Sequence, residues 1–223
     1  MLTSRFSHRI KLGSIMLCCA IAISACNRGA SDKAQQTLSD FQRLNDDGAP
    51  ANVSNTFAAQ PWACVADRYT GLTWEMKTTQ PGLRNKDNTY SWYNPDQDSN
   101  GGDPGLRNGG KCSGSDCDTL AYVEAVNAKG LCGFKDWRLP TKIEISTLND
   151  ARIKHPGPTL DTVFFPEVHG AQYWTSAAYS AHYAGAWAWS FDYGYDRVDW
   201  KKTPKYLRLV RGTLAVKVKD PDD

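Results

Sequence analysis

Residues 136–144 read Asp136-Trp-Arg-Leu-Pro-Thr-Lys-Ile-Glu144, and this stretch is the most informative one for the fold. Thr141 and Glu144 have the spacing of a capping box, in which the threonine side chain caps a helix and the glutamate side chain reaches back to the threonine amide. The stretch therefore predicts a short helix that follows Thr141 and ends near Asn149–Ala151.

The chain on the N-terminal side of this stretch predicts one more helix and two strands. Residues 118–130 begin with a capping aspartate, carry apolar residues at helical spacing and end with a capping glycine. Residues 64–75 are typical of two short strands around a turn at Thr70-Gly71. Residues 79–117 are dominated by Asn, Asp, Gly and Pro, which indicates a long loop.

The chain on the C-terminal side predicts β structure. In residues 186–196 aromatic residues occupy the odd positions and small or polar residues the even ones. This period of two predicts a strand with one aromatic face. Residues 206–211 indicate a closing strand. Strands, a long loop, two helices and further strands follow one another, so the sequence predicts an α+β fold.

The N-terminus is typical of a bacterial lipoprotein signal peptide. Residues 1–11 contain three basic and no acidic residues, residues 12–23 are mostly apolar, and Ser24-Ala25 precede Cys26. This ending resembles a lipobox, so we expect cleavage before Cys26 and acylation of its side chain. An ordinary signal peptide with a chance cysteine is the alternative. The residue after Cys26 is not aspartate, which favours sorting to the outer membrane of a Gram-negative bacterium.

Composition divides the chain into four parts. We expect residues 1–25 to be the signal peptide, 26–60 the lipidated cysteine with a flexible tether, 61–213 the folded domain and 214–223 a tail. The whole chain has a formal charge of +2, but without residues 1–25 it has 23 basic and 24 acidic residues. This near-neutral balance argues against charge-driven binding of nucleic acid, and the acyl anchor predicts the membrane as one partner.

The remaining cysteines indicate two disulfides in an exported domain. Besides Cys26, and Cys18 and Cys19 of the expected signal peptide, they are Cys64, Cys112, Cys117 and Cys132, and four cysteines allow three pairings. We expect Cys112 to pair with Cys117 in a tight local loop, and Cys64 to pair with Cys132. A zinc site is the alternative, but the chain has no Cys-x-x-Cys pair and no histidine near these cysteines.

Several segments together resemble the Lcl C-terminal domain family, which is named after the Legionella collagen-like adhesin. The matching segments are residues 67–75, the loop that ends at Cys112 and Cys117, and residues 128–141, 173–176, 186–194 and 206–212. Residues 136–144 also resemble a segment of formylglycine-generating sulfatase-modifying proteins, which have a C-type-lectin-like fold. The resemblance implies a C-type-lectin-like domain of small antiparallel sheets with two helices, pinned by disulfides.

The resemblance also implies a function. The namesake adhesin binds sulfated polysaccharides through this domain, so we expect a lectin-like domain for polysaccharide binding or adhesion at the cell envelope. A structural or assembly component that binds another envelope protein is the alternative. An enzyme is not expected: the chain has no Ser-His-Asp order, no zinc-type histidine pair and no phosphate-binding glycine loop. Formylglycine-generating chemistry needs cysteines late in the domain, and Cys132 is the last one.

One stretch of the long loop resembles the first half of a calcium-binding loop. Oxygen-bearing side chains alternate along it and a glycine follows. The candidate calcium ligands are Asp96, Asp98, Asn100 and Asp103. Arg107 stands where such a loop needs a bidentate glutamate. A solvated turn is the alternative, because Asp, Asn and Gly are also the common turn residues.

Aromatic residues close to basic residues form the second candidate site. Tryptophan and tyrosine rings stack on the C–H faces of sugars, and basic side chains bind the sulfate or carboxylate groups of anionic polysaccharides. The basic residues of this region are Arg197, Lys201, Lys202, Lys205 and Arg208. We expect a ligand to contact Tyr195, Arg197, Trp200, Lys201 and Lys202. The alternative is a solvated charged face, with the aromatic residues 187–191 in the core.

Overall fold

The computed structural model describes residues 40–52 and 56–218. Within these residues one antiparallel sheet has the order β1-β2-β3-β7 and a second has the order β4-β5-β6. The strands of the first sheet are β1 (Phe41–Leu44), β2 (Cys64–Asp67), β3 (Thr73–Glu75) and β7 (Val210–Arg211). Those of the second are β4 (Gln172–Ala178), β5 (Gly185–Ser190) and β6 (Tyr195–Trp200). The α-helices are α2 (Thr119–Lys129) and α3 (Lys142–Ser146), and a short 3-10 turn covers Leu131–Gly133.

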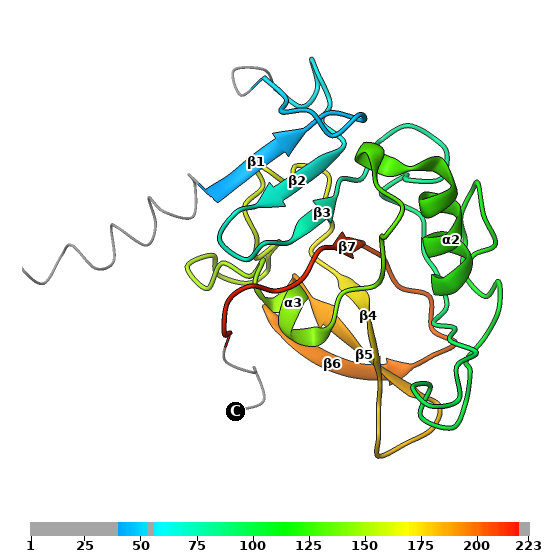
Figure 1. Cartoon of the computed structure of the whole chain (residues 1–223). Helices are drawn as coiled ribbons and strands as arrows, with labels where there is room; N and C mark the ends of the chain where they lie inside the picture. Colours follow the sequence, from blue (N-terminus) through cyan, green and yellow to red (C-terminus); the bar gives the residue numbers. More distant parts are fainter. Residues whose placement is uncertain (1–39, 53–55, 219–223) are drawn as a thin grey trace, which may run out of the picture. The chain divides into compact units, whose positions relative to one another are not determined.

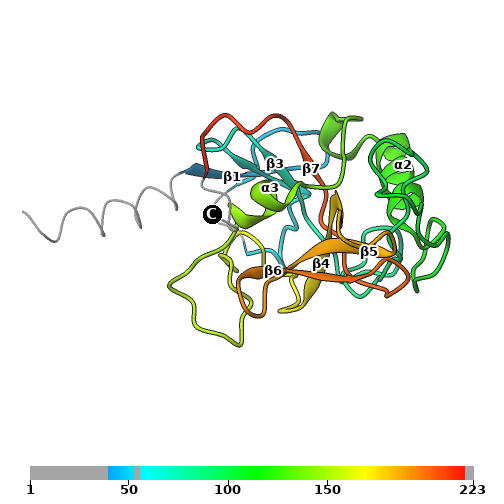
Figure 2. The same ribbon diagram turned by 90° about the horizontal axis from the view of Figure 1, so that it is seen from below.

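The two sheets form separate layers (Figures 1 and 2). Figure 2 shows the four-stranded sheet above the three-stranded one, and both views place α2 beside the sheets. The shorter helix α3 packs against β4 and β5. The predicted α+β class, with small antiparallel sheets and two helices, is confirmed. No helix in the part of the chain that the structure describes has the length and apolar character needed to cross a bilayer.

Both predicted helix starts are confirmed. Asp118 caps α2 by accepting a hydrogen bond from Ala121 N, and Gly130 ends it in a left-handed conformation. Thr141 and Glu144 form the capping box of α3. The α-helix ends at Ser146 rather than near residues 149–151, and the chain continues in tighter turns in which Leu148 N donates to Ile145 O at 3.2 Å and Asn149 N to Ser146 O at 3.0 Å.

The stretch 136–144 connects α3 to the first sheet. The guanidinium of Arg138 donates to both carboxylate oxygens of Glu144, at 2.8 and 2.6 Å, so the capping glutamate is also part of an ion pair. The backbone of Arg138 exchanges two hydrogen bonds with Val210 of β7, at 2.9 and 3.0 Å. One short segment therefore starts a helix and closes an edge of the sheet.

The prediction of a single strand over residues 186–196 is wrong. The chain forms β5 up to Ser190, turns at residues 191–194 and returns as β6, with Ser190 paired to Tyr195. Gly194 has a φ of +79°, a conformation that a side chain disfavours, and its amide donates to Ser190 O at 2.7 Å. The alternation of aromatic residues continues through the turn, at Phe191 and Tyr193, although β5 ends at Ser190.

The folded part of the chain includes residues before the predicted domain start at residue 61. Residues 41–44 form β1 and pair with β2, so Phe41 lies opposite Asp67 and Leu44 opposite Cys64. Arg43 packs its guanidinium over the Trp62 ring, 4.1 Å from the ring centroid. At the other end, Ala215 N donates to Thr70 O, so the expected tail begins in contact with the domain. The signal peptide and Cys26 lie outside the described residues.

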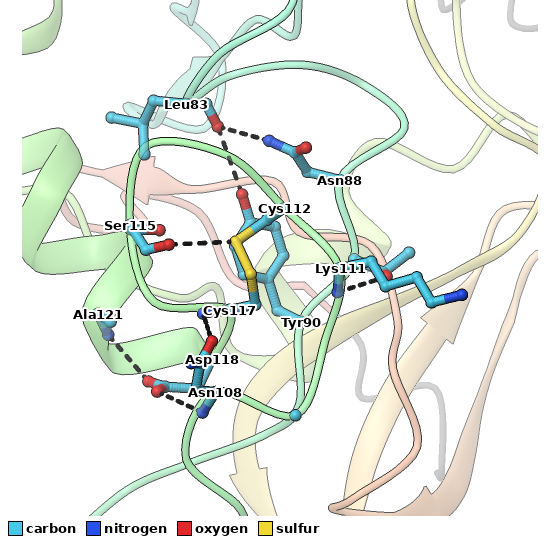
Figure 3. The surroundings of a disulfide bond; sticks show 12 residues. Leu83, Asn88, Tyr90, Asn108, Lys111, Cys112, Ser115, Cys117, Asp118 and Ala121 are labelled. Atoms are coloured by element: carbon cyan, nitrogen blue, oxygen red, sulfur yellow. Dashed lines mark hydrogen bonds between the residues drawn. A yellow bond between two sulfur atoms is a disulfide. The ribbon is translucent and has the colours of Figure 1, made fainter.

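Both predicted disulfides are present, Cys64 with Cys132 and Cys112 with Cys117. Figure 3 shows the second one, which closes the end of the long loop beside the start of α2. The side-chain oxygen of Asn108 accepts a hydrogen bond from Cys117 N at 2.8 Å. The backbone N of Asn108 donates to the Asp118 carboxylate at 3.0 Å. The disulfide loop is thereby attached to the helix cap.

Buried aromatic residues fill two clusters. One surrounds the Cys64–Cys132 disulfide and includes Trp92, Trp137 and Trp174. The other includes Trp74, Trp189 and Phe191. Most of the abundant tryptophan of this chain therefore stabilises the core rather than the surface.

A network of charged and polar side chains is buried in the core. Glu75 accepts hydrogen bonds from Lys77 Nζ at 3.0 Å, from the Tyr122 hydroxyl and from Leu209 N at 3.0 Å. Arg208, which is fully buried, donates to Glu75 O. Burial lowers the pKa of the Lys77 ammonium to about 8, although Glu75 partly offsets this. Arg208 therefore belongs to the core and not to a basic surface.

Candidate ligand-binding surface

β6 is an edge strand of its sheet, and it carries most of the residues predicted to bind a ligand (Figure 1). Successive side chains of a strand point to opposite faces. One face of β6 carries Asp196, Val198 and Trp200, and the other carries Tyr195, Arg197 and Asp199. Tyr195 and Trp200, at opposite ends, are roughly 17 Å apart along the strand. The structure does not bring them together.

Trp200 is the centre of an exposed aromatic cluster. Its ring lies 5.1 Å from that of His182, edge to face, and His182 stacks on Tyr183 at 4.8 Å. Trp200 is 51 % exposed and Tyr183 is 59 % exposed. The two come together because Trp200 pairs with Gly185, directly after the turn that carries His182 and Tyr183. We call His182, Tyr183 and Trp200 the Trp200 cluster.

Lys201 does not lie on the surface, contrary to the prediction. The side chain of Lys201 points inward, whereas that of the neighbouring Trp200 points outward. Lys201 is only 2 % exposed. The ammonium donates to the carbonyl oxygens of Asn100 at 2.6 Å, of Asp103 at 2.7 Å and of Tyr183. Burial lowers the pKa of Lys201, and Asp103 partly offsets this. Lys201 therefore joins the long loop to the turn that carries the aromatic cluster.

The predicted calcium ligands form a closed set of turns. Asp96 accepts from Asp98 N at 3.1 Å and from Ser99 Oγ at 2.6 Å. Asn100 Oδ1 accepts from Gly102 N at 2.9 Å, and Asp103 Oδ1 accepts from Gly105 N at 2.7 Å. Asp96 and Asp98 are exposed, whereas Asn100 is buried.

Two carbonyl oxygens of this loop already bind a cation, the ammonium of Lys201. Within residues 40–52 and 56–218, no group of three or more His, Cys, Asp or Glu side chains could hold a metal ion. Calcium binding stays a prediction, and the arrangement shows how the loop is held together by protein groups.

The basic residues do not share a surface. Lys205 is buried, and its ammonium donates to Asp199 and Gln172, both at 2.5 Å. Hydrogen bonds from Lys205, Trp200 N and Thr203 lower the pKa of Asp199, although burial opposes this shift. Arg197 and Lys202 are exposed, but Arg197 is on the face opposite to Trp200. The predicted basic patch is therefore reduced to separate side chains.

Tyr195 belongs to a second aromatic group, at the other end of β6. Its ring lies 5.6 Å from that of Tyr193, which in turn lies 5.5 Å from the His155 ring. Both tyrosines are nearly half exposed.

Sequence reasoning missed His182 as a surface aromatic residue. The alternation over residues 186–196 predicted one continuous strand and not the turn at residues 191–194. Without that turn, the pairing of Gly185 with Trp200 could not be predicted. The available signal for a hairpin was Gly194, because a glycine at the end of a short turn between two strands is typical of a hairpin.

A comparison with known families gives one match. The model of the Lcl C-terminal domain matches residues 63–211. Searches of the curated proteins and of the solved structures gave no match. The matched range contains both disulfides, both α-helices and the Trp200 cluster.

Proposed function

The chain belongs to the Lcl C-terminal domain family, and from this premise we propose that it is a non-catalytic saccharide-binding lipoprotein of the cell envelope. The proposal includes a C-type-lectin-like fold for the domain. It also includes cleavage before Cys26, acylation of that cysteine and anchoring in the outer membrane. The polar residues after Cys26 then hold the domain away from the lipid surface.

The observation that carries the binding proposal is the Trp200 cluster. Grouped exposed aromatic rings are a feature of binding surfaces, and sugars present C–H faces that stack on such rings. Three rings contact one another in series, Trp200 edge to face with His182 and His182 stacked on Tyr183, which gives an exposed aromatic surface larger than a single ring, and we call this surface the platform. A linear polysaccharide is the ligand that fits this shape.

The platform is held in place before any ligand arrives. Lys201 hydrogen-bonds to Tyr183 O and to two carbonyl oxygens of the acidic loop, so both sides of the cluster are attached to one buried ammonium. Preorganisation of this kind lowers the entropy lost on binding.

A glycan array tests the binding proposal, with bacterial polysaccharides and heparin-like chains, with and without calcium. We expect Trp200→Ala to weaken the binding of an array hit at least tenfold, because alanine removes the ring that stacks on sugars. Tyr69→Ala, which removes an exposed tyrosine elsewhere, is the matched control. A wild-type protein that binds no glycan in either condition would overturn the proposal and favour an envelope protein as partner.

Metabolic labelling with palmitate tests the anchor. We expect labelled wild-type protein, an unlabelled Cys26→Ser variant, and accumulation of the uncleaved form with globomycin. Equal labelling of the wild type and of Cys26→Ser would show that Cys26 is not the acylated residue.

A further inference from the structure

The outer edge of β6 is an unpaired strand edge. Among the strands of residues 40–52 and 56–218, only β5 pairs with β6. Lys201 N donates to Ala184 O at 2.9 Å, so the backbone groups of Lys201 point toward the β5 side. Because this direction alternates along a strand, the odd-numbered residues of β6 also point toward β5. The even-numbered ones, Asp196, Val198 and Trp200, point their backbone groups outward.

The chain itself closes only the far end of this outer edge. Trp200 N donates to Asp199 Oδ1 at 2.7 Å, and Trp200 O accepts a hydrogen bond from Thr203 N at 2.8 Å. In the part of the chain that the structure describes, the outward N and O atoms of Asp196 and Val198 have no hydrogen-bond partner. Unpaired backbone groups on an edge strand are a template for one more strand.

The side chains of this open segment are exposed as well. Val198 is 38 % exposed, although valine is usually a buried residue. Arg197 is exposed and forms no ion pair with another described residue. Asp199 lies on the same face of β6 as Arg197, and its side chain is 30 % exposed. The Asp199 carboxylate already accepts from Lys205, but a carboxylate has about four acceptor sites, so it can accept further bonds.

We propose that the outer edge of β6 pairs antiparallel with the same edge of a second copy of this chain, with Val198 on the twofold axis. A twofold pair uses the same surface on both copies. In this arrangement Val198 exchanges two backbone hydrogen bonds with Val198 of the second copy, and Asp196 N of each copy faces Trp200 O of the other. The two exposed valine side chains then contact each other across the axis.

The charges of β6 select this register. With Val198 on the axis, Arg197 of each copy lies opposite Asp199 of the other, which gives two contacts between opposite charges. An axis at Arg197 would place two arginines opposite each other, and an axis at Asp199 would place two aspartates opposite each other. Like charges directly opposite are destabilising. Charge complementarity therefore favours a second copy as the occupant of this edge.

The membrane anchor strengthens such a pair. One strand pairing buries little surface, so we expect weak association in dilute solution. Anchoring of both copies through Cys26 raises their local concentration; this step rests on the proposed function, whereas the pairing itself does not. The pair also places both Trp200 clusters on one face of a continuous sheet, roughly 14 Å apart along the strands, where one long polysaccharide can reach both.

Cysteine cross-linking of the full chain in the cell envelope tests the proposal. Residues opposite each other in a hydrogen-bonded pair have Cα atoms about 5.5 Å apart, which suits a disulfide. We therefore expect Val198→Cys to form a disulfide-linked dimer on a non-reducing gel. Arg197→Cys is the matched control. In this register its two Cα atoms are roughly 7–8 Å apart, so we expect about fivefold less dimer.

The other outcomes overturn the proposal. A dimer of Arg197→Cys that equals or exceeds that of Val198→Cys would show that the register is wrong. A mixed disulfide of Val198→Cys with a different protein would assign the edge to another partner. The absence of any cross-link through Val198→Cys would show that a second copy does not occupy the edge.

Charge reversal tests the complementarity. Arg197→Glu places an acid opposite Asp199 of the second copy, so we expect the yield of the Val198→Cys dimer to fall about tenfold. Lys202→Glu makes the same change of charge at an exposed residue outside β6 and is expected to leave the yield unchanged. The melting temperature of Arg197→Glu is expected to equal that of the wild type, because Arg197 is exposed. Equal dimer yields in the two variants would contradict the role of Arg197.

The pair and the proposed function fail in different ways. Cross-linking through Val198→Cys, with no glycan bound on the array, leaves the pair standing and overturns the saccharide-binding proposal. Array binding that needs Trp200, with no cross-linking through Val198→Cys, overturns the pair and leaves the proposed function standing.

Discussion

Lys201 is the residue whose position changes the interpretation of the sequence most. It stands in a run of charged residues, so its ammonium was expected in solvent. The structure instead buries it against three carbonyl oxygens, two of them from the loop that resembles a calcium site. The stem of a lysine is long and apolar enough to cross the space over Trp92, whose ring centroid lies 4.8 Å from the ammonium. The ammonium group of Lys201 therefore holds this loop in place through hydrogen bonds.

Replacing Lys201 by methionine removes that cation and keeps a similar volume. Three buried carbonyl oxygens then lose a charged donor, so we expect the free energy of unfolding to fall by about 2–4 kcal/mol. Urea denaturation followed by tryptophan fluorescence measures the change. Lys202→Met is the control, since Lys202 is exposed and its loss is expected to cost less than about 0.5 kcal/mol. Equal stabilities of the two variants would contradict this role of Lys201.

The β5–β6 hairpin is the element that the sequence describes least well. Alternation predicts extended chain, and residues 186–191 follow it, but a tight turn can continue the same alternation by chance. Both faces of β5 are buried, because Ala188 and Trp189 point to opposite sides and each is covered. Helix starts and the Cys112–Cys117 disulfide were predictable because their signals are local, and with that pair assigned only Cys64 and Cys132 remained. The pairing partner of a strand depends on distant residues, so the composition of the binding surface was not predictable.

Gly194 tests the turn of this hairpin. An alanine there would keep the unfavourable φ of +79° and place its Cβ 2.7 Å from Asn149 Oδ1. We expect Gly194→Ala to lower the free energy of unfolding by about 2 kcal/mol. Gly130→Ala is the control, because Gly130 has a similar positive φ of +71° but its added Cβ meets only the flexible Lys135 side chain, at 3.6 Å or more. Thermal denaturation of both variants measures the difference, and an equal loss would show that the contact with Asn149 has no effect.

At the scale of the whole molecule, the boundaries of the domain depended on contacts rather than on composition. Residues 41–44 lie in a stretch of polar composition, yet they complete an edge of the first sheet and bring Phe41 against Phe164 and Phe165. The Cys64–Cys132 disulfide then connects distant parts of one core, since these cysteines are 68 residues apart. The N-terminal part of the domain is therefore attached to the rest both by strand pairing and by a covalent bond.

The stability of the whole domain is expected to depend on pH through its buried network. Burial lowers the pKa of Lys77 to about 8 in the folded state, below its ordinary value of 10.5. Between these two values the unfolded state binds more protons, so the free energy of unfolding rises with pH. Lys201, whose pKa is also lowered by burial, contributes in the same direction. Above about pH 10 the sign reverses, because burial raises the pKa of Tyr122, and raises that of Tyr173 to about 12.

Urea denaturation at pH 7 to 11 measures this dependence. We expect a rise from pH 8 to a maximum near pH 10 and a fall beyond it. Lys77→Met leaves Glu75 without its ammonium partner, although Tyr122 and Leu209 N still donate to it, so we expect a loss of about 3 kcal/mol at pH 7. The same variant should lose most of the rise between pH 8 and 10 and keep the fall caused by the tyrosines. An unchanged rise in Lys77→Met would show that another group controls the stability of the domain in this range.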